Sequence, residues 1–199
     1  MRQRQFFFDT ETTCLFPKRG EQGPMPNIIQ LGFMLVDEGR EQALFHCLIK
    51  PNGWTIPEES KRIHGITTEM CERCGIPIDE AMLIFKTFSS ELGLMIAHNY
   101  EFDSAIVDLE LRRLGFEAGT FSDPRQFCTM KASTEMVGAV GTNSRGTFTK
   151  YPKLHEAYSF FTGRDMAGDG FAAHSAIGDV QACRVIYDHI LAARVAVNV

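Results

Sequence analysis

The stretch Gln5-Phe6-Phe7-Phe8-Asp9-Thr10-Glu11-Thr12 decides how this chain is expected to fold. Residues 5–9 form a short apolar run, rich in aromatic side chains, that ends at acidic residues, which predicts a buried strand. Because side chains alternate between the faces of a strand, Asp9 and Glu11 lie on the same side if the strand continues that far. Two carboxylates that point the same way are hard to accommodate without a cation. A strand that simply ends in a polar turn would leave the same pattern.

The segments that follow this strand indicate an α/β fold. Further strands are predicted at 28–36, 42–49 and 94–97, and helices at 79–92, between Asn99 and Gly115, at 153–162 and at 177–190. Asn99 is expected to cap the helix that follows it. Residues 17–26 are predicted to form a surface loop, and residues 138–150 a mobile loop, because both lack an apolar period. The order of strand, hairpin, helix, strand and helix predicts a sheet with helices packed on it.

Length and composition predict one folded, soluble domain over residues 1–199. The chain has 199 residues, of which 44% are hydrophobic and 23% charged, and its formal net charge is -5. An acidic chain has no strong positive field for long nucleic acids, so a histone-like or operator-binding role is not expected. The six cysteines are scattered, and no signal peptide or membrane-spanning segment is expected. These features predict reduced thiols and a cytoplasmic location.

Two further acidic residues and a histidine follow at predicted element ends. Asp103 lies at the start of the helix after strand 94–97, and Asp179 begins the last helix. Hard divalent cations take oxygen ligands, and a pair of them about 4 Å apart can hold both the attacking and the leaving oxygen of a phosphoryl displacement. His174 precedes Asp179 by five residues, so its imidazole is placed to act as a general base. The sequence thus predicts that these acids converge on a metal-dependent site.

Five ordered motifs resemble the DEDDh family of 3′-5′ exonucleases. They are Phe8-Asp9-Thr10-Glu11-Thr12-Thr13, Ile28-Ile29-Gln30-Leu31-Gly32, Ile63-His64-Gly65-Ile66-Thr67, Ala97-His98-Asn99 with Phe102-Asp103, and His174 spaced from Asp179. The resemblance runs in order from about residue 5 to residue 192. It implies an RNase H-like fold, a mixed five-stranded sheet flanked by helices, and an enzyme that releases 5′-mononucleotides from a 3′ end.

The resemblance also assigns expected roles to residues. It implies two divalent cations, Mg²⁺ or Mn²⁺, with Asp9 bridging both, Glu11 and Asp179 on the nucleophile-side metal, and Asp103 on the second. His174 is expected to deprotonate the attacking water, so the expected catalytic set is His174 with the four acids. The expected substrate-binding residues are Thr10, Thr12, Thr13, Leu15, His64, His98, Asn99 and Phe102.

The sequence departs from the family pattern in two places. Cys14 stands where glycine commonly follows the acidic motif, and because a Cβ resists positive φ, the turn is expected to differ there. The loop at 17–26, with Lys18 and Arg19, is longer than the minimal family form and is interpreted as solvated. Arg112 and Arg113 are likewise interpreted as a solvated helix face. Arg145, Lys150 and Lys153 are favoured over Arg112 and Arg113 as contacts to a nucleic-acid backbone.

The expected partner is the single-stranded or frayed 3′ end of a nucleic acid, with DNA favoured over RNA. A DNA polymerase or another replication or repair protein is a further candidate partner, and no membrane is involved. Three alternatives stay open: a non-catalytic nucleic-acid-binding accessory subunit, an exoribonuclease that trims RNA 3′ ends, and a zinc-dependent domain built on Cys71 and Cys74. In the last case, the single CxxC pair would need two further ligands.

Overall fold

A mixed five-stranded sheet forms the centre of the protein, as expected. A computed structural model describes residues 4–89, 93–117, 125–172 and 174–197. The strands lie in the order β3-β2-β1-β4-β5. Their bounds are β1 Gln5–Thr12, β2 Ile28–Asp37, β3 Arg40–Leu48, β4 Leu94–Ala97 and β5 Gln126–Cys128. β1 pairs antiparallel with β2 and parallel with β4, so β1 is the central strand of the sheet.

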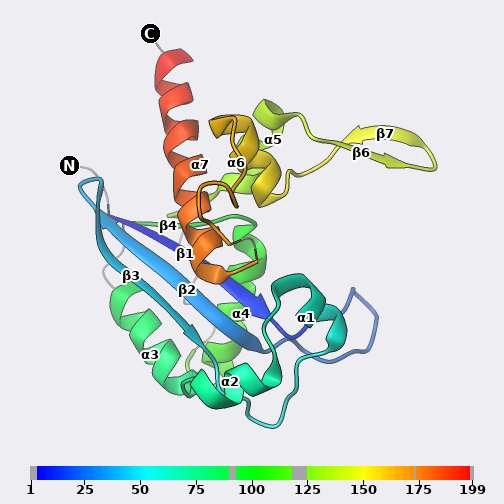
Figure 1. Ribbon diagram of the computed structural model, residues 1–199, viewed down its shortest axis with the longest axis vertical. Coiled ribbons are helices and arrows are strands. Elements are labelled where there is room, and N and C mark those ends of the chain that lie inside the picture. Colours follow the sequence, from blue (N-terminus) through cyan, green and yellow to red (C-terminus); the bar gives the residue numbers. More distant parts are fainter. Residues whose placement is uncertain (1–3, 90–92, 118–124, 173, 198–199) are drawn as a thin grey trace.

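The aromatic run of β1 faces alternate sides of the sheet, and each side is covered by helices (Figure 1). Phe6 and Phe8 pack with helices α3 and α4 (Ile78–Ser89 and Tyr100–Arg113), whereas Phe7 packs with helix α7 (Ala176–Val197). All three phenylalanine side chains have no exposed surface. β1 is therefore buried on both faces, which explains why its sequence is a continuous apolar run rather than an alternating one.

Several short elements were not expected from the sequence. They are α1 Glu58–His64, α2 Thr68–Cys74, β5 and α5 Thr129–Val137. None of the residues of α1 is buried and only Cys71 is buried in α2, so their sequences carry little apolar periodicity. The expected end of helix 79–92 lies partly outside the described residues, since α3 is described as far as Ser89.

Residues 138–150 require a correction. The segment expected to be a loop contains a two-stranded antiparallel hairpin, β6 Val140–Asn143 with β7 Gly146–Thr149, and its mobility stays a prediction. Glycine, threonine and serine dominate this segment, so it shows no apolar alternation. Its strands are largely exposed, and the hairpin projects away from the sheet (Figure 1). The hairpin leads into helix α6 (Leu154–Thr162), which packs against α7.

The loop at 17–26 is present as expected, with Lys18 and Arg19 exposed. In the described parts of the chain, no helix combines the length and the apolar character needed to cross a bilayer.

Candidate active site

Asp9 and Glu11 both lie on β1, which continues as far as Thr12. Phe7, two residues before Asp9, packs with α7, so strand alternation directs Asp9 and Glu11 to the same face. On the neighbouring strand β2, Gly32 lies opposite Asp9 and Gln30 lies opposite Glu11. The expected placement of the two carboxylates on one side of a strand is thus confirmed.

Gln30 and Gly32 bring the start of α7 against this face. The side-chain oxygen of Gln30 accepts a hydrogen bond of 2.9 Å from the Ala176 backbone N–H. A Cβ on Gly32 would lie 2.8 Å from the carbonyl carbon of Ala176, closer than real Cβ atoms approach. Only glycine therefore allows this packing. Neither residue has a role that was expected from the sequence, although a glutamine and a glycine within a buried strand were a usable signal.

Asp103 approaches from the opposite side of β1. It lies in the first turn of α4 and is only 2% exposed. Its Oδ1 accepts hydrogen bonds from the Thr10 backbone N–H, at 3.0 Å, and from the Thr10 hydroxyl, at 2.8 Å. Thr10 thus orients an expected metal ligand, and its expected contact with substrate stays a prediction.

The acidic residues raise one another's pKa values. Burial raises the pKa of Asp9 well above its usual value, and the charges of Asp103, Asp179 and Glu11 raise it further. Burial, followed by the charges of Asp179 and Asp103, raises the pKa of Glu11 to about 8. The pKa of Asp103 is raised to about 7, chiefly by burial and against the hydrogen bonds from Thr10. These carboxylates therefore lie close enough to repel each other strongly.

His174 and Asp179 complete the group at the start of α7. Glu11, His174 and Asp179 each offer one ligand atom, and these atoms lie within 4.8 Å of one another. Burial raises the pKa of Asp179 to about 7, while a hydrogen bond from the His174 backbone opposes this shift. Within the described residues, the buried Oδ1 of Asp179 has no hydrogen-bond partner.

This arrangement fits divalent cations. A buried carboxylate oxygen without a partner and four acids that repel one another are both unfavourable unless positive charge lies among them. The available donors are carboxylate oxygens, which Mg²⁺ and Mn²⁺ prefer. The residues that would hold the ions are Asp9, Glu11, Asp103 and Asp179.

His174 is held in an unusual backbone conformation, with φ at 56°. Its ring is partly exposed, and its pKa is lowered by partial burial and by the nearby His155 and Lys153. His155, at the start of α6, was not expected near the site. A Cβ on Gly178 would lie 2.4 Å from the carbonyl oxygen of Ala172, so this glycine lets the segment before His174 pack against α7.

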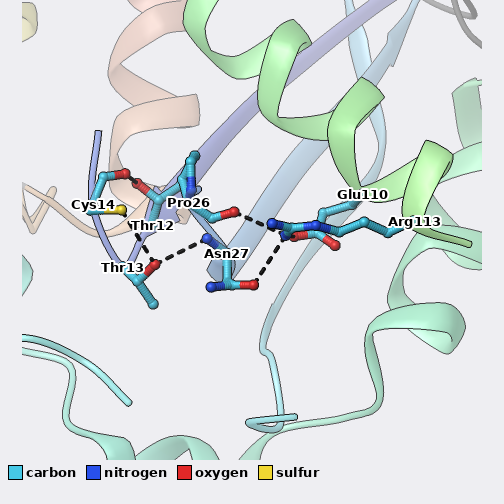
Figure 2. Close-up of polar contacts among 7 residues, drawn as sticks. All are labelled: Thr12, Thr13, Cys14, Pro26, Asn27, Glu110 and Arg113. Carbon is cyan, nitrogen blue, oxygen red and sulfur yellow. Dashed lines mark hydrogen bonds and ion pairs between the residues drawn. The ribbon is translucent and has the colours of Figure 1, made fainter. Parts of the chain in front are cut away.

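Thr12 and Thr13 support the turn after β1 (Figure 2), and their expected contacts with substrate stay predictions. The Thr12 hydroxyl donates to the Cys14 carbonyl at 2.9 Å, and the Thr13 hydroxyl accepts from the Asn27 backbone N–H at 3.0 Å. In the described residues Cys14 is not among those with positive φ, so the turn does not need the glycine that the family commonly has there.

Arg113 connects this turn to α4, which corrects its interpretation as a solvated side chain. Its guanidinium donates to the Pro26 carbonyl at 2.9 Å and to the Asn27 side chain at 3.0 Å, and it pairs with Glu110 at 2.6 Å (Figure 2). Arg112, in contrast, pairs with Asp108 on the exposed face of α4.

His98 makes contacts with protein through both ring nitrogens. Nδ1 lies 3.0 Å from the Thr129 hydroxyl, and Nε2 lies 3.1 Å from the Pro152 carbonyl. Because a carbonyl only accepts, Nε2 carries the proton, and burial lowers the pKa of the ring to about 4. His98 joins the end of β4 to the segment before α6, and its expected substrate contact stays a prediction.

The other expected substrate residues differ in accessibility. Leu15 is 75% exposed, and Phe102 is half-buried against Phe16. His64 Nδ1 accepts from the Ile66 backbone N–H at 3.0 Å, while its buried Nε2 has no partner among the described residues. Asn99 occupies the N-cap position of α4 with φ at 74°, but its side chain makes no capping hydrogen bond, so the expected cap is wrong.

The CxxC pair does not form a metal site in the described structure. Cys71 is buried and directs its sulfur to the Ile29 carbonyl at 3.8 Å, whereas Cys74 is exposed. Among the described residues, the group able to hold a metal consists of Glu11, His174 and Asp179. The alternative of a zinc-dependent domain on Cys71 and Cys74 therefore lacks its two further ligands.

Comparisons with known proteins agree on one family. The family model "Exonuclease" (RNase_T) matches residues 6–187. A DNA polymerase III subunit epsilon-like protein of Rhodobacter capsulatus is 33% identical over 71% of this chain and 19% of its own length. The 3′-5′ exonuclease DinG of Bacillus subtilis is 30% identical over 58% of this chain and 12% of its own.

Solved structures of similar fold include exonuclease I. The E. coli exonuclease I complex with a dT13 oligonucleotide has a TM-score of 0.71 and 15% identity, covering 96% of this chain and 41% of the other. Exonuclease I of Methylocaldum szegediense has a TM-score of 0.71 and 16% identity, covering 96% and 40%. The expected RNase H-like fold is confirmed, and the chain spans well under half the length of these relatives.

Proposed function

The chain belongs to the RNase_T exonuclease family, and from that premise we propose that it is a 3′-5′ exonuclease that releases 5′-mononucleotides. The observation that supports this most strongly is the group of Glu11, His174 and Asp179, with ligand atoms within 4.8 Å, beside Asp9 and Asp103. Carboxylates and an imidazole suit phosphodiester hydrolysis because they bind cations and accept a proton from water. We further propose that residues 1–199 form a single exonuclease domain.

The acidic residues and His174 have different proposed roles in the reaction. Asp9, Glu11, Asp103 and Asp179 would hold two divalent cations, Mg²⁺ or Mn²⁺, with Asp9 shared between them. Such ions, when bound, neutralise the charge that develops on the phosphate and lower the pKa of water. His174 accepts the proton of the attacking water through its neutral imidazole, which the lowered pKa favours near neutral pH.

The terminal nucleotide is proposed to contact Leu15 and Phe102. The exposed Leu15 side chain and the half-buried Phe102 ring offer apolar surface on which a base can pack. Lys153, whose charge adds to the effect of burial in lowering the pKa of His174, supplies positive charge for the backbone phosphate on the α6 side. Substrate binding thus depends on both sides of the carboxylate group.

The proposed substrate is the single-stranded or frayed 3′ end of DNA. This preference draws support from relatives named as DNA polymerase III proteins and from the exonuclease I structure with a dT13 oligonucleotide. A DNA polymerase or another replication or repair protein is proposed as a partner on the same ground.

A degradation assay tests the proposal. Single strands of DNA and RNA, labelled at either end, are incubated with the protein and Mn²⁺ or Mg²⁺. We expect a 3′ label to appear at once as a mononucleotide and a 5′ label to shorten stepwise, with DNA degraded faster than RNA. Excess chelator is expected to abolish degradation of both DNA and RNA. Among the variants, Asp9→Ala is expected to lose activity most completely, since the Asp9 carboxylate is proposed to serve both ions.

Other results of this assay would contradict the proposed mechanism or support an alternative function. Full activity in excess chelator contradicts the metal-dependent mechanism. Faster degradation of RNA supports an exoribonuclease, and binding of single strands without any cleavage supports a non-catalytic accessory subunit. The matched control is Asp108→Asn, which removes a carboxylate of α4 that pairs with Arg112 on the exposed face and is expected to leave the rate unchanged.

A further inference from the structure

The group of Glu11, His174 and Asp179 differs from a purely carboxylate site because it includes a nitrogen donor. The ligand atoms of the three side chains lie within 4.8 Å of one another. The buried Oδ1 of Asp179 has no hydrogen-bond partner among the described residues, so it is available to a cation. The donor set is therefore one imidazole nitrogen and two carboxylates.

Mg²⁺ and Zn²⁺ differ in which of these donor atoms they prefer. Mg²⁺ prefers oxygen ligands and keeps several waters, so it gains little from the imidazole. Zn²⁺ binds both imidazole nitrogen and carboxylate oxygen, commonly with three protein ligands and one open position. Affinity for mixed nitrogen and oxygen sites also rises from Mn²⁺ to Zn²⁺. The same three side chains thus favour a borderline-soft cation over Mg²⁺.

Binding of Zn²⁺ requires the three side chains to move closer to one another. Ligand atoms at about 2.0 Å from a tetrahedral Zn²⁺ lie about 3.3 Å apart, so the three groups must close from the observed separation. Glu11 is fixed on β1 and Asp179 on α7, whereas the His174 ring is partly exposed. Rotation about the side-chain bonds of all three residues is therefore needed for this closure.

We propose that Glu11, His174 and Asp179 form a Zn²⁺ site that competes with the catalytic arrangement of the same residues. An imidazole bound to Zn²⁺ has no free lone pair with which to accept a proton, so occupation of this site inhibits the reaction. The inhibition rests on the proposed exonuclease function, whereas the binding itself does not.

Calorimetric titration of the metal-free protein with ZnCl₂ tests the site. We expect one Zn²⁺ per chain, and we expect His174→Gln to weaken Zn²⁺ binding by at least about 10-fold, the scale at which metal sites respond to changes in their ligand environment. Mn²⁺ affinity, which depends on the carboxylates, is expected to change by less than about 3-fold. Two matched controls, His155→Gln near the site and Cys74→Ser in the CxxC pair, are expected to keep the Zn²⁺ affinity of the original protein.

Co²⁺ gives an independent spectroscopic measurement. Its visible absorption depends on the donor atoms and on their geometry, so the spectrum of the original protein is expected to change in His174→Gln and to persist in His155→Gln. Equal Zn²⁺ affinity in the original protein and His174→Gln overturns the proposal, as does loss of the site in Cys74→Ser. Zn²⁺ binding through His174 without inhibition of nucleotide release overturns the competition alone. Zn²⁺ binding through His174 in a protein without nuclease activity contradicts the proposed function and not the site.

Discussion

At the scale of single residues, replacing His174 is expected to affect the protein differently from replacing one of the four carboxylates. Its ring is partly exposed and its backbone has φ at 56°, so it contributes little to the packed core. The carboxylates, in contrast, are held by β1, α4 and α7. Replacing His174 is therefore expected to change proton transfer more than folding or Mn²⁺ binding.

His174→Gln is expected to lower kcat by about 10² to 10⁴, the usual range for a lost general base. Because the pKa of His174 is lowered, its imidazole stays neutral at more acidic pH than a free histidine does. The rate of the original protein should thus fall only below the pH at which a free histidine becomes protonated, about 6.5, and this fall should be reduced in the variant. The measurement is the single-turnover rate against pH at saturating Mn²⁺.

The control for this experiment is His46→Gln, which replaces an exposed histidine of β3. It is expected to reproduce the original pH profile. A His174→Gln protein that keeps the original rate, or the original acid midpoint, would show that another group accepts the proton.

At the scale of elements, the contact between β2 and α7 determines where Asp179 lies. The Gln30 side chain accepts a hydrogen bond from the Ala176 backbone N–H, and Gly32 leaves room for the Ala176 carbonyl. Both contacts lie one helical turn before Asp179, and neither residue touches the carboxylate group in the described hydrogen bonds. The geometry of the proposed metal site therefore depends on how closely α7 approaches β2.

Gly32→Ala is expected to force α7 away from β2. The new Cβ would lie 2.8 Å from backbone, which cannot move as a flexible side chain does, so we expect a loss of stability of about 1–3 kcal/mol. Displacement of Asp179 should also weaken Mn²⁺ binding. Urea unfolding and Mn²⁺ titration measure the two effects.

Gly23→Ala is the matched control, because a Cβ there would meet only the Pro17 side chain in the surface loop, with two atoms at 3.4 and 3.6 Å. It is expected to change neither property. A Gly32→Ala protein with the original stability and Mn²⁺ affinity would refute the close packing of β2 and α7.

At the scale of the whole molecule, the carboxylate group makes stability depend on pH in a direction opposite to that of ordinary paired carboxylates. The pKa values of Asp9, Glu11, Asp103 and Asp179 are all raised, so the folded chain binds more protons than the unfolded chain above about pH 4. Their contribution is fully present below the unfolded pKa values and is lost as pH rises through the folded values of about 7 to about 8.

We therefore expect the metal-free protein to melt at least about 5 °C lower at pH 8.5 than at pH 5.5. Mn²⁺ should raise Tm more at pH 8.5, because protons then compete less for the carboxylates. Asp9→Asn should reduce the pH dependence, whereas Glu101→Gln, which alters an exposed carboxylate paired with Lys131, should not. Thermal unfolding with and without chelator measures this, and a Tm that rises from pH 5.5 to 8.5 without metal would contradict it.

The net charge of -5 limits how the chain binds nucleic acid. For about three phosphate contacts on a single strand, log affinity should fall with log salt at a slope of roughly -2. Fluorescence anisotropy with the slow His174→Gln variant and a labelled oligonucleotide measures this slope. A slope as steep as about -6 would instead indicate an extended basic surface.

Much of the fold could be predicted from local sequence patterns. Elements that bury much of their surface show an apolar run or an apolar periodicity in the sequence. These elements are β1, β2, β3, β4, α3, α4, α6 and α7. The shorter or more exposed elements α1, α2, β5 and the β6–β7 hairpin bury too few side chains to show one.

The sequence by itself determined which residues are proposed to carry the chemistry, because an acidic pair on a strand and acids at helix starts are local features. Only the tertiary structure decided how they meet. Thr10 binds Asp103 across 93 residues, and Gln30 binds the Ala176 backbone across 146. Such contacts depend on how strands and helices pack, and no local periodicity encodes the partner of a buried polar group. The structural contacts of His98 and Arg113 could not be predicted for the same physical reason.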